Sequence, residues 1–212
     1  MRIVIFGPQG AGKGTQSALI AEKYGIPAIS TGEIFRWAIK GQTALGQKVT
    51  EYVDAGRLVP DELTIGVVRE RLASDDCKDG FLVDGFPRNL EQAEALNEIS
   101  DATGGPLDAA LVIEVPENIS LRRLLGRRVC TQCGRNYHID APPRENWTCD
   151  VCGGEVVGRT DDVEEETIRA RLKLYYDQTE PMKAYYADRG ILKVVDGVGT
   201  PDAVFDRIVA AL

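Results

Sequence analysis

Histidine is nearly absent from this chain: His138 is the only one among 212 residues. A Ser-His-Asp set needs a histidine that accepts the proton of its nucleophile. His138 lies inside a cysteine-rich segment, and we find no pair of carboxylates arranged for acid–base catalysis. We therefore expect neither nucleophilic catalysis of the serine-hydrolase type nor paired-carboxylate chemistry.

Long apolar runs are also missing. No run approaches the roughly 20 residues of a membrane-spanning helix, and the N-terminal apolar stretch ends at Gly7, too early for a signal peptide. There is no internal repeat and no low-complexity tract. With 43% hydrophobic and 27% charged residues, the composition is typical of a soluble globular protein. We expect one domain with elaborations, a cytoplasmic location and no membrane partner.

Positive charge is in deficit. The chain has 25 Lys and Arg against 33 Asp and Glu, a formal net charge of −8. A nucleic-acid-binding surface needs a basic patch and is usually found on a basic domain, so we expect no nucleic-acid partner. Binding of a small phosphate compound is not excluded, because it depends on where individual arginines lie.

The most informative feature that is present is the glycine-rich segment Gly7-Pro8-Gln9-Gly10-Ala11-Gly12-Lys13-Gly14-Thr15. It follows the apolar run Ile3–Phe6 and precedes a helical pattern that starts near Gln16. Glycines let successive backbone N–H groups point at one anion, and the helix adds its positive N-terminal end. Lys13 supplies a charge for the distal phosphates. Because a chance glycine-rich turn would lack this combination, we expect a nucleoside triphosphate site.

Short apolar runs alternate with helical patterns along the chain. The runs are Arg2–Phe6, Pro27–Ile29, Phe81–Val83, Ala109–Glu114 and Ile191–Val195. The helical patterns are Gln16–Tyr24, Ile34–Ala55, Asp61–Ala73, Leu90–Ile99, Ile119–Leu125, Glu165–Ala187 and Pro201–Leu212. This alternation predicts an α/β fold, with a parallel sheet covered by helices on both faces.

Two segments break that alternation. Residues 30–59 hold mostly helix where a single crossover would suffice. Residues 126–162 carry four of the five cysteines and little helical periodicity, which predicts a small metal-stapled insert of β type.

The cysteines of this second segment form two CxxC pairs, Cys130/Cys133 and Cys149/Cys152, with 15 residues between the pairs. In a reducing compartment this spacing indicates a tetrahedral Zn²⁺ site with four thiolate ligands; two disulfides are the alternative. Four protein ligands close the tetrahedron, so the metal would be structural. The remaining Cys77 is expected to be a buried thiol.

An acidic residue, Asp84, ends the apolar run Phe81–Val83 and is followed by Gly85-Phe86-Pro87-Arg88. A carboxylate at the carboxyl end of a central strand can face the phosphate loop and hold Mg²⁺, and Arg88 can bind a phosphate with its two-pronged guanidinium. An ordinary strand-end turn is the alternative, and the nearby phosphate loop disfavours it.

Arginines gather at the ends of the cysteine-rich segment. Arg123 and Arg127 stand four apart on one helical face that runs into it, Arg159 leaves it, and Arg171 lies on the next helix. In phosphoryl transfer, positioning and charge neutralisation do most of the work. Several arginines at the hinges of a movable insert therefore suggest a clamp for a highly charged transition state.

Together these residues resemble the adenylate kinase family, in its bacterial form with a long, zinc-binding lid. The resemblance covers the whole chain and is carried by Gly7–Thr15, Ser30-Thr31-Gly32, Arg36, Gly56-Arg57-Leu58-Val59, Asp84–Arg88, Gln92, Gly126-Arg127-Arg128, the four paired cysteines, Arg159-Thr160-Asp161-Asp162, Arg171 and Val195-Asp196-Gly197.

This resemblance implies a P-loop nucleoside monophosphate kinase fold with a five-stranded parallel sheet. Residues 1–29, 60–125 and 163–212 would form the core, residues 30–59 a helical monophosphate-binding insert, and residues 126–162 a zinc-binding lid. The implied reaction is MgATP + AMP ⇌ 2 ADP, a step in adenine nucleotide homeostasis. It would proceed in a monomer by direct in-line transfer, with no covalent enzyme intermediate.

The resemblance also implies roles for individual residues. ATP would be held by Gly10, Ala11, Gly12, Lys13, Gly14, Thr15, Arg123, Arg127, Asn136, Tyr137 and Gly199. AMP would be held by Thr31, Arg36, Arg57, Leu58, Val59, Gly85, Phe86, Pro87, Arg88, Gln92, Arg159 and Arg171, with Gln92 reading the adenine edge. The catalytic residues would be Lys13, Asp84, Arg88, Arg123, Arg159 and Arg171. The metal ligands would be Cys130, Cys133, Cys149 and Cys152, and Asp161 would help fasten the lid.

Three other functions fit part of the sequence. A kinase of UMP or CMP, or one using GTP as donor, would share the fold, but Gln92 and the long lid favour adenine at the acceptor site. A zinc-ribbon nucleic-acid binder would share the CxxC pairs but not the acidic charge. A nucleotide-sensing switch without catalysis would not need Lys13, Asp84 and all the arginines.

Overall fold

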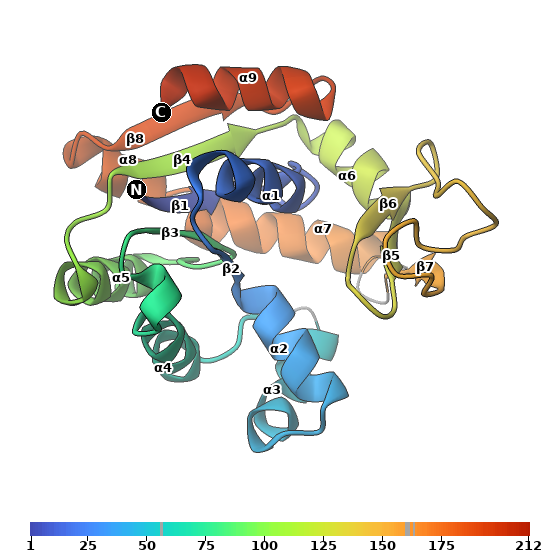
Figure 1. Ribbon diagram of the computed structural model, residues 1–212, viewed down its shortest axis with the longest axis horizontal. Coiled ribbons are helices and arrows are strands. Elements are labelled where there is room, and N and C mark those ends of the chain that lie inside the picture. The colour runs from blue at the N-terminus through green and yellow to red at the C-terminus, as the bar shows by residue number, and fades with distance from the viewer. Residues whose placement is uncertain (56, 160–161, 163) are drawn as a thin grey trace.

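A five-stranded parallel sheet forms the centre of the computed structural model, which describes residues 1–55, 57–159, 162 and 164–212 (Figure 1). The motif residues Gly56, Thr160 and Asp161 lie outside the described residues. The strand order is β2-β3-β1-β4-β8, and all four pairings are parallel. The bounds are β1 Arg2–Phe6, β2 Ala28–Ser30, β3 Phe81–Asp84, β4 Ala109–Glu114 and β8 Leu192–Asp196. The predicted parallel sheet is confirmed, with each strand within one residue of its apolar run at either end.

The alternation of side chains along β1 divides the core into two halves. Val4 and Phe6 pack into a cluster on one face of the sheet, while Ile3 and Ile5 pack into a cluster on the other. Successive side chains of a strand point to opposite faces, so a strand that is apolar at every position must be covered on both. All four residues are at most 3% exposed.

Helices cover the two faces. The cluster around Val4 contains side chains of α4 (Asp61–Leu72), α5 (Leu90–Thr103) and α8 (Met182–Asp188). The cluster around Ile3 contains side chains of α1 (Lys13–Tyr24) and α9 (Pro201–Ala211). The remaining core elements are the 3₁₀ turn Asp75–Cys77, α6 (Glu117–Leu125) and α7 (Glu165–Leu174).

The long helical pattern Glu165–Ala187 does not form one helix, contrary to expectation. After α7 the chain passes through a π-helical turn, Tyr175–Thr179, and resumes as α8. Pro181 lies at this junction and has no N–H to donate to a continuing helix. The break is therefore local: α7 packs against α6 through Ile168 and Leu172, and α8 packs into the cluster around Val4.

The pattern Ile34–Ala55 is also two helices, α2 (Thr31–Lys40) and α3 (Ala44–Asp54). Gln42 takes a left-handed backbone with φ 50°, which ends the first helix, and the Thr43 hydroxyl then accepts a 3.1 Å hydrogen bond from the N–H of Gly46 to begin the second. The two helices lie against each other below the sheet (Figure 1). Their core, around Phe35, Val49 and Val59, is separate from those of the sheet.

The cysteine-rich segment contains a three-stranded antiparallel sheet, in the order β6-β5-β7, which confirms the expected β structure. Its strands are β5 Arg127–Cys130, β6 Asn136–His138 and β7 Val156–Gly158. The buried apolar cluster of this sheet consists of Cys130, Cys149 and Val156, with Tyr137 packed against it. Three buried side chains make a very small core, so this sheet needs another source of stability.

The contact between α2 and α3 yields a stability prediction. A Cβ atom at Gly46 would collide with the backbone carbonyl of Ala38, whereas a Cβ atom at the exposed helical residue Gly66 of α4 would meet no atom within 4 Å. We expect Gly46→Ala to destabilise residues 31–54 by roughly 1–3 kcal/mol and Gly66→Ala to stabilise the protein by about 0.5–1 kcal/mol.

Denaturant unfolding together with amide hydrogen exchange of residues 31–54 would measure both effects. Unchanged protection of α2 and α3 in Gly46→Ala would show that the close approach of these helices has little energetic importance.

Candidate functional site

The glycine-rich loop between β1 and α1 forms the centre of the site. Gly7, Gly10 and Gly12 have φ values of 149°, 82° and 97°, conformations that glycine adopts without a Cβ penalty. α1 begins directly at Lys13, so its free N–H groups and positive end face the loop. The Lys13 ammonium donates to the carbonyls of Gly7 at 2.8 Å and Pro8 at 3.0 Å. The predicted strand–loop–helix arrangement for binding phosphates is therefore present.

Burial shifts the pKa values of Lys13 and Asp84, which attract each other at the carboxyl edge of the sheet. Burial lowers the pKa of Lys13 to about 8, with attraction to Asp84 opposing it and repulsion from Arg88 and Arg127 adding to it. Burial likewise raises the pKa of Asp84 above its usual range, and Lys13 opposes that rise. Parallel pairing aligns Asp84 with Ile5 of β1 and Ser30 of β2. The loops that follow these three strands therefore begin side by side at the carboxyl edge of the sheet.

A large cavity of about 1050 Å³ opens over the phosphate loop. All eleven residues expected to hold ATP line it: Gly10, Ala11, Gly12, Lys13, Gly14, Thr15, Arg123, Arg127, Asn136, Tyr137 and Gly199. They come from α1, α6, β5, β6 and the loops beside β1 and β8, segments that are far apart in sequence.

A second, smaller cavity of about 80 Å³ lies beside the helices α2 and α4. Ten of the twelve residues expected to hold AMP line it: Thr31, Arg36, Arg57, Leu58, Val59, Gly85, Arg88, Gln92, Arg159 and Arg171. The other two, Phe86 and Pro87, are buried, and the ring of Phe86 belongs to the core under the sheet. Their side chains support the turn and do not line this cavity.

The two cavities share a wall. Six residues line both of them: Gly32, Arg36, Gly85, Arg88, Arg159 and Arg171. The wall is tightly packed at Gly85, whose carbonyl accepts hydrogen bonds from the Thr31 hydroxyl at 3.0 Å and the Arg88 Nε at 2.8 Å. Two ligands in these cavities would therefore meet at a surface of four guanidinium groups.

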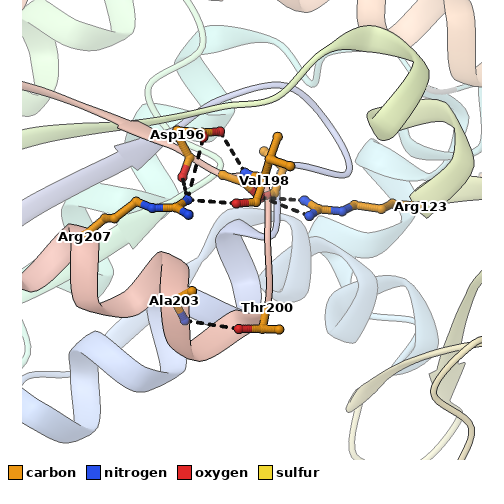
Figure 2. A network of polar contacts seen from close by, with 8 residues as sticks. Arg123, Asp196, Val198, Thr200, Ala203 and Arg207 are labelled. Carbon is orange, nitrogen blue, oxygen red and sulfur yellow. Dashed lines mark hydrogen bonds and ion pairs between the residues drawn. The ribbon is translucent and has the colours of Figure 1, made fainter.

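Arg123 links the phosphate loop to the loop between β8 and α9. Its guanidinium donates to the carbonyls of Gly10, Ala11 and Gly197 at 3.3, 3.4 and 3.0 Å. From the other side, Arg207 donates to the carbonyls of Asp196 at 2.7 Å and Val198 at 2.8 Å, so the loop is held between two arginines (Figure 2). This arrangement fixes the backbone around Gly199 at the edge of the large cavity.

The carboxylate of Asp162, only 2% exposed, pairs with two of the expected phosphate-binding arginines. It accepts from Arg127 Nε at 2.6 Å and from Arg171 Nη1 at 2.8 Å. Burial lowers the pKa of Arg127 to about 10, repulsion from Arg159 adds to this, and attraction to Asp162 opposes it. From the sequence we expected Asp161 to fasten the lid, and that residue lies outside the described residues. The role of Asp162 was not predicted. The only signal for Asp162 in the sequence is its position just after the motif that contains Arg159.

The three-stranded sheet lies close to both the phosphate loop and α2. The ideal Cβ position of Gly14 is 3.9 Å from the Asn136 amide nitrogen. The Lys40 ammonium of α2 donates to the carbonyl of Thr131, between the first two cysteines, at 2.9 Å. Two segments that flank the cavities thus touch each other in this structure.

The four paired cysteines gather in one cluster, with all sulfur atoms within 4.8 Å of one another. Cys130 and Cys152 lie 3.4 Å apart, and Cys133 and Cys149 lie 3.6 Å apart, measured between sulfur atoms. A tetrahedron of sulfurs at about 2.3 Å from zinc has edges of roughly 3.8 Å, so this donor set fits zinc. The backbone N–H of Gln132 donates to the sulfur of Cys130 at 3.4 Å. The hydroxyl of Tyr137 donates to the sulfur of Cys149 at 3.3 Å.

Lone Cys77 and His138 lie outside this cluster. Cys77 is buried, as expected, and accepts a 3.1 Å hydrogen bond from Arg71. The His138 ring packs against Gly126, where a Cβ would collide with it, and its Nδ1 accepts from the N–H of Asp140 at 3.1 Å. Among the described residues, no helix is long and apolar enough to span a membrane.

Comparison with known proteins supports the same interpretation as the geometry. The family model for adenylate kinase matches residues 5–191. An adenylate kinase of Clostridium botulinum (strain 657 / Type Ba4) is 52% identical over 209 residues, covering 98% of this chain and 96% of that protein. One from Clostridioides difficile (strain 630) is 50% identical over 213 residues, covering 100% of this chain and 98% of that protein. Since similarity of this strength extends from the phosphate loop through the cysteine cluster to the last helix, the chain belongs to the adenylate kinase family.

Proposed function

We propose that this chain catalyses MgATP + AMP ⇌ 2 ADP by direct transfer of the terminal phosphoryl group. The observation that carries the proposal is the wall of arginines shared by two cavities of different size. A phosphoryl group passing between nucleotides must cross such a wall, where positive charge offsets the charge that develops in the transition state.

ATP would occupy the large cavity. The N–H groups of Gly10 to Thr15 and the N-terminus of α1 would cradle its phosphates, and Lys13 would exchange the carbonyls of Gly7 and Pro8 for the transferred group. Asn136 and Tyr137 would cover the nucleotide, and the loop around Gly199 would lie near its adenine. Arg123 would bind phosphate from its place between the loops.

AMP would occupy the small cavity. The arginines at positions 36, 57 and 88 would bind its phosphate, Thr31, Leu58, Val59 and the Gly85–Pro87 turn would shape the site, and Gln92 would read the adenine edge. Arg88, Arg159 and Arg171 would contact the transferred group from the shared wall. Mg²⁺ bound with ATP would neutralise phosphate charge, and Asp84 is the carboxylate beside Lys13 that would hold it.

We assign residues 1–29, 60–125 and 163–212 to a core, residues 30–59 to a monophosphate-binding insert, and residues 126–162 to a lid. The separate apolar clusters of α2/α3 and of the cysteine-rich sheet support this division. Segments with their own small cores can move as units and exclude water from the transferred group. We propose a monomer as the functional unit, as the family resemblance implies.

We assign structural Zn²⁺ to Cys130, Cys133, Cys149 and Cys152. Four thiolates leave no coordination position for substrate, so the metal would stabilise the lid and would not take part in the transfer. The very small apolar core of the three-stranded sheet supports this assignment.

The first test offers ATP and Mg²⁺ with AMP, UMP, CMP or GMP singly and measures ADP formation. We expect turnover with AMP only, because Gln92 places an amide at the base-reading end of the small cavity. Preference for another acceptor would keep the mechanism but refute the substrate assignment. Failure with all four would favour a nucleotide-binding switch.

The pKa of Lys13 yields a second prediction. In the free protein the pKa of Lys13 is about 8, and the anionic phosphates of ATP must raise it. At pH 8.5, where ATP is fully ionised, we therefore expect ATP binding to take up protons, and ATP affinity to weaken as pH rises through 8. Calorimetry in buffers of different ionisation enthalpy measures the uptake.

Lys13→Met is the matched control for this experiment. It should abolish the proton uptake and lower kcat by roughly 100-fold or more, since one preorganised donor typically contributes that much. Equal proton uptake in wild type and Lys13→Met would assign the titration to another group.

The metal assignment yields a third prediction. The purified protein should carry one zinc per chain, and chelation should lower its Tm by roughly 5 °C or more, because a loss of about 2 kcal/mol produces such a shift in a protein of this size. Cys133→Ser should lose the metal, whereas Cys77→Ser should retain it. A metal-free sample with the Tm of the wild type would refute a stabilising role for zinc.

A further inference from the structure

The carboxylate of Asp61 lies directly behind the small cavity. Asp61 is the first residue of α4 and is not among the residues that line the cavity. Its two oxygens accept hydrogen bonds from two amides at the start of α5: Oδ1 from Gln92 Nε2 at 2.6 Å, and Oδ2 from Asn89 Nδ2 at 2.8 Å. One carboxylate therefore joins two helices at the residue expected to read the base.

The partners of Gln92 permit only one orientation of its amide. Its Oε1 accepts from the backbone N–H of Arg88 at 2.8 Å, and its Nε2 donates to Asp61. A backbone N–H only donates and an ionised carboxylate only accepts. Turning the amide over would set oxygen against Asp61 and NH₂ against the N–H of Arg88, so both hydrogen bonds would become repulsive contacts.

The backbone of Gln92 is held as firmly as its side chain. The Asn89 side chain caps α5 by accepting from the N–H of Gln92 at 2.9 Å, while its own amide nitrogen is held by Asp61. Gln92 is 1% exposed, so its position is fixed by packing as well. Asp61 thus acts on Gln92 twice, once directly and once through Asn89.

We propose that Asp61 is a positioning residue that makes Gln92 selective for a 6-aminopurine. An amide nitrogen has two hydrogens, and Asp61 accepts one; among the described residues the other has no protein acceptor. In the proposed AMP site this hydrogen would be donated to the ring nitrogen N1 of adenine. The second lone pair of Oε1 would accept from the 6-amino group.

A 6-oxopurine presents the opposite pattern, because its N1 carries a hydrogen and its C6 carries a carbonyl oxygen. It would be accepted only by the reversed amide, and Asp61 makes that reversed amide unfavourable. A site that leaves polar groups unpaired rejects the wrong ligand strongly. The selectivity therefore depends on a carboxylate that the nucleotide does not contact.

The test is Asp61→Asn, which keeps the shape of the side chain but allows its amide to offer either oxygen or nitrogen to Gln92. We expect the ratio of kcat/KM for AMP to that for IMP to fall about tenfold, through a higher KM for AMP, with kcat and the KM for ATP nearly unchanged. Glu62→Gln, an exposed neighbour on α4 with the same charge change, is the control and should keep the wild-type ratio.

A second variant separates positioning from loss of stability. Gln92→Ala should lower the AMP/IMP ratio by itself, and adding Asp61→Asn to it should lower the ratio no further. A ratio in Asp61→Asn equal to that of Glu62→Gln, or an equal fall with and without Gln92, would overturn the proposal.

The inference rests on the proposed AMP acceptor site, and the assays distinguish the two. Wild-type protein that does not use AMP overturns the proposed function and this inference with it. Wild-type protein that uses AMP, combined with an unchanged ratio in Asp61→Asn, overturns only the role of Asp61.

Discussion

Repulsion among cations packed around one small space is the constraint on which the rest of this structure depends. Lys13 is repelled by Arg88, Arg127 and Arg171, and Arg127 is repelled by Arg159 and Arg171. The chain as a whole carries a net charge of −8, so the site is a local concentration of positive charge in an acidic protein. Two carboxylates, half-buried Asp84 and buried Asp162, offset part of it. The phosphates of two bound nucleotides would supply the remaining negative charge.

This charge balance explains why the site is assembled from separate parts. Asp162 pairs with one arginine from the three-stranded sheet and one from α7, so it keeps two cations together without a ligand. Phosphate oxygens would compete for the same guanidinium groups. A site built rigidly would hold all its cations at full repulsion when empty. In the proposed mechanism, a site that closes on its substrates would bring its cations together with phosphate anions, which would offset that repulsion.

The core of the fold could be predicted from the sequence because its signals are local. Strand β1 and its phosphate loop are contiguous, and the spacing of the CxxC pairs alone predicts the cluster of four sulfur atoms. The breaks at Gln42 and Pro181 lie within apolar patterns that keep the helical period on both sides. The pattern alone therefore predicts one helix where the left-handed residue or the proline separates two. Asp61 and Asp162 could not be identified from the sequence. The partners of Asp61 lie 28 and 31 residues away along the chain, and those of Asp162 lie 35 residues before it and 9 residues after it, on separate elements. An acidic residue in a helix or a turn has no pattern of its own.

The two cavities differ in how the structure prepares them. The large cavity has a frame fixed by the core: Arg123 joins two loops at the edge of the sheet, and Arg207 holds one of them from behind (Figure 2). The small cavity lies between α2, which packs in a separate cluster, and the start of α5, where Asp61 fixes the amide of Gln92. The cluster in which α2 packs also includes Leu63 and Val67 of α4, so α2 and the network of Asp61 meet at that helix. In the proposed AMP site, the hydrogen bonds of Asp61 and Asn89 would keep the amide of Gln92 preorganised for the base, and α2 would bound the phosphate-binding side.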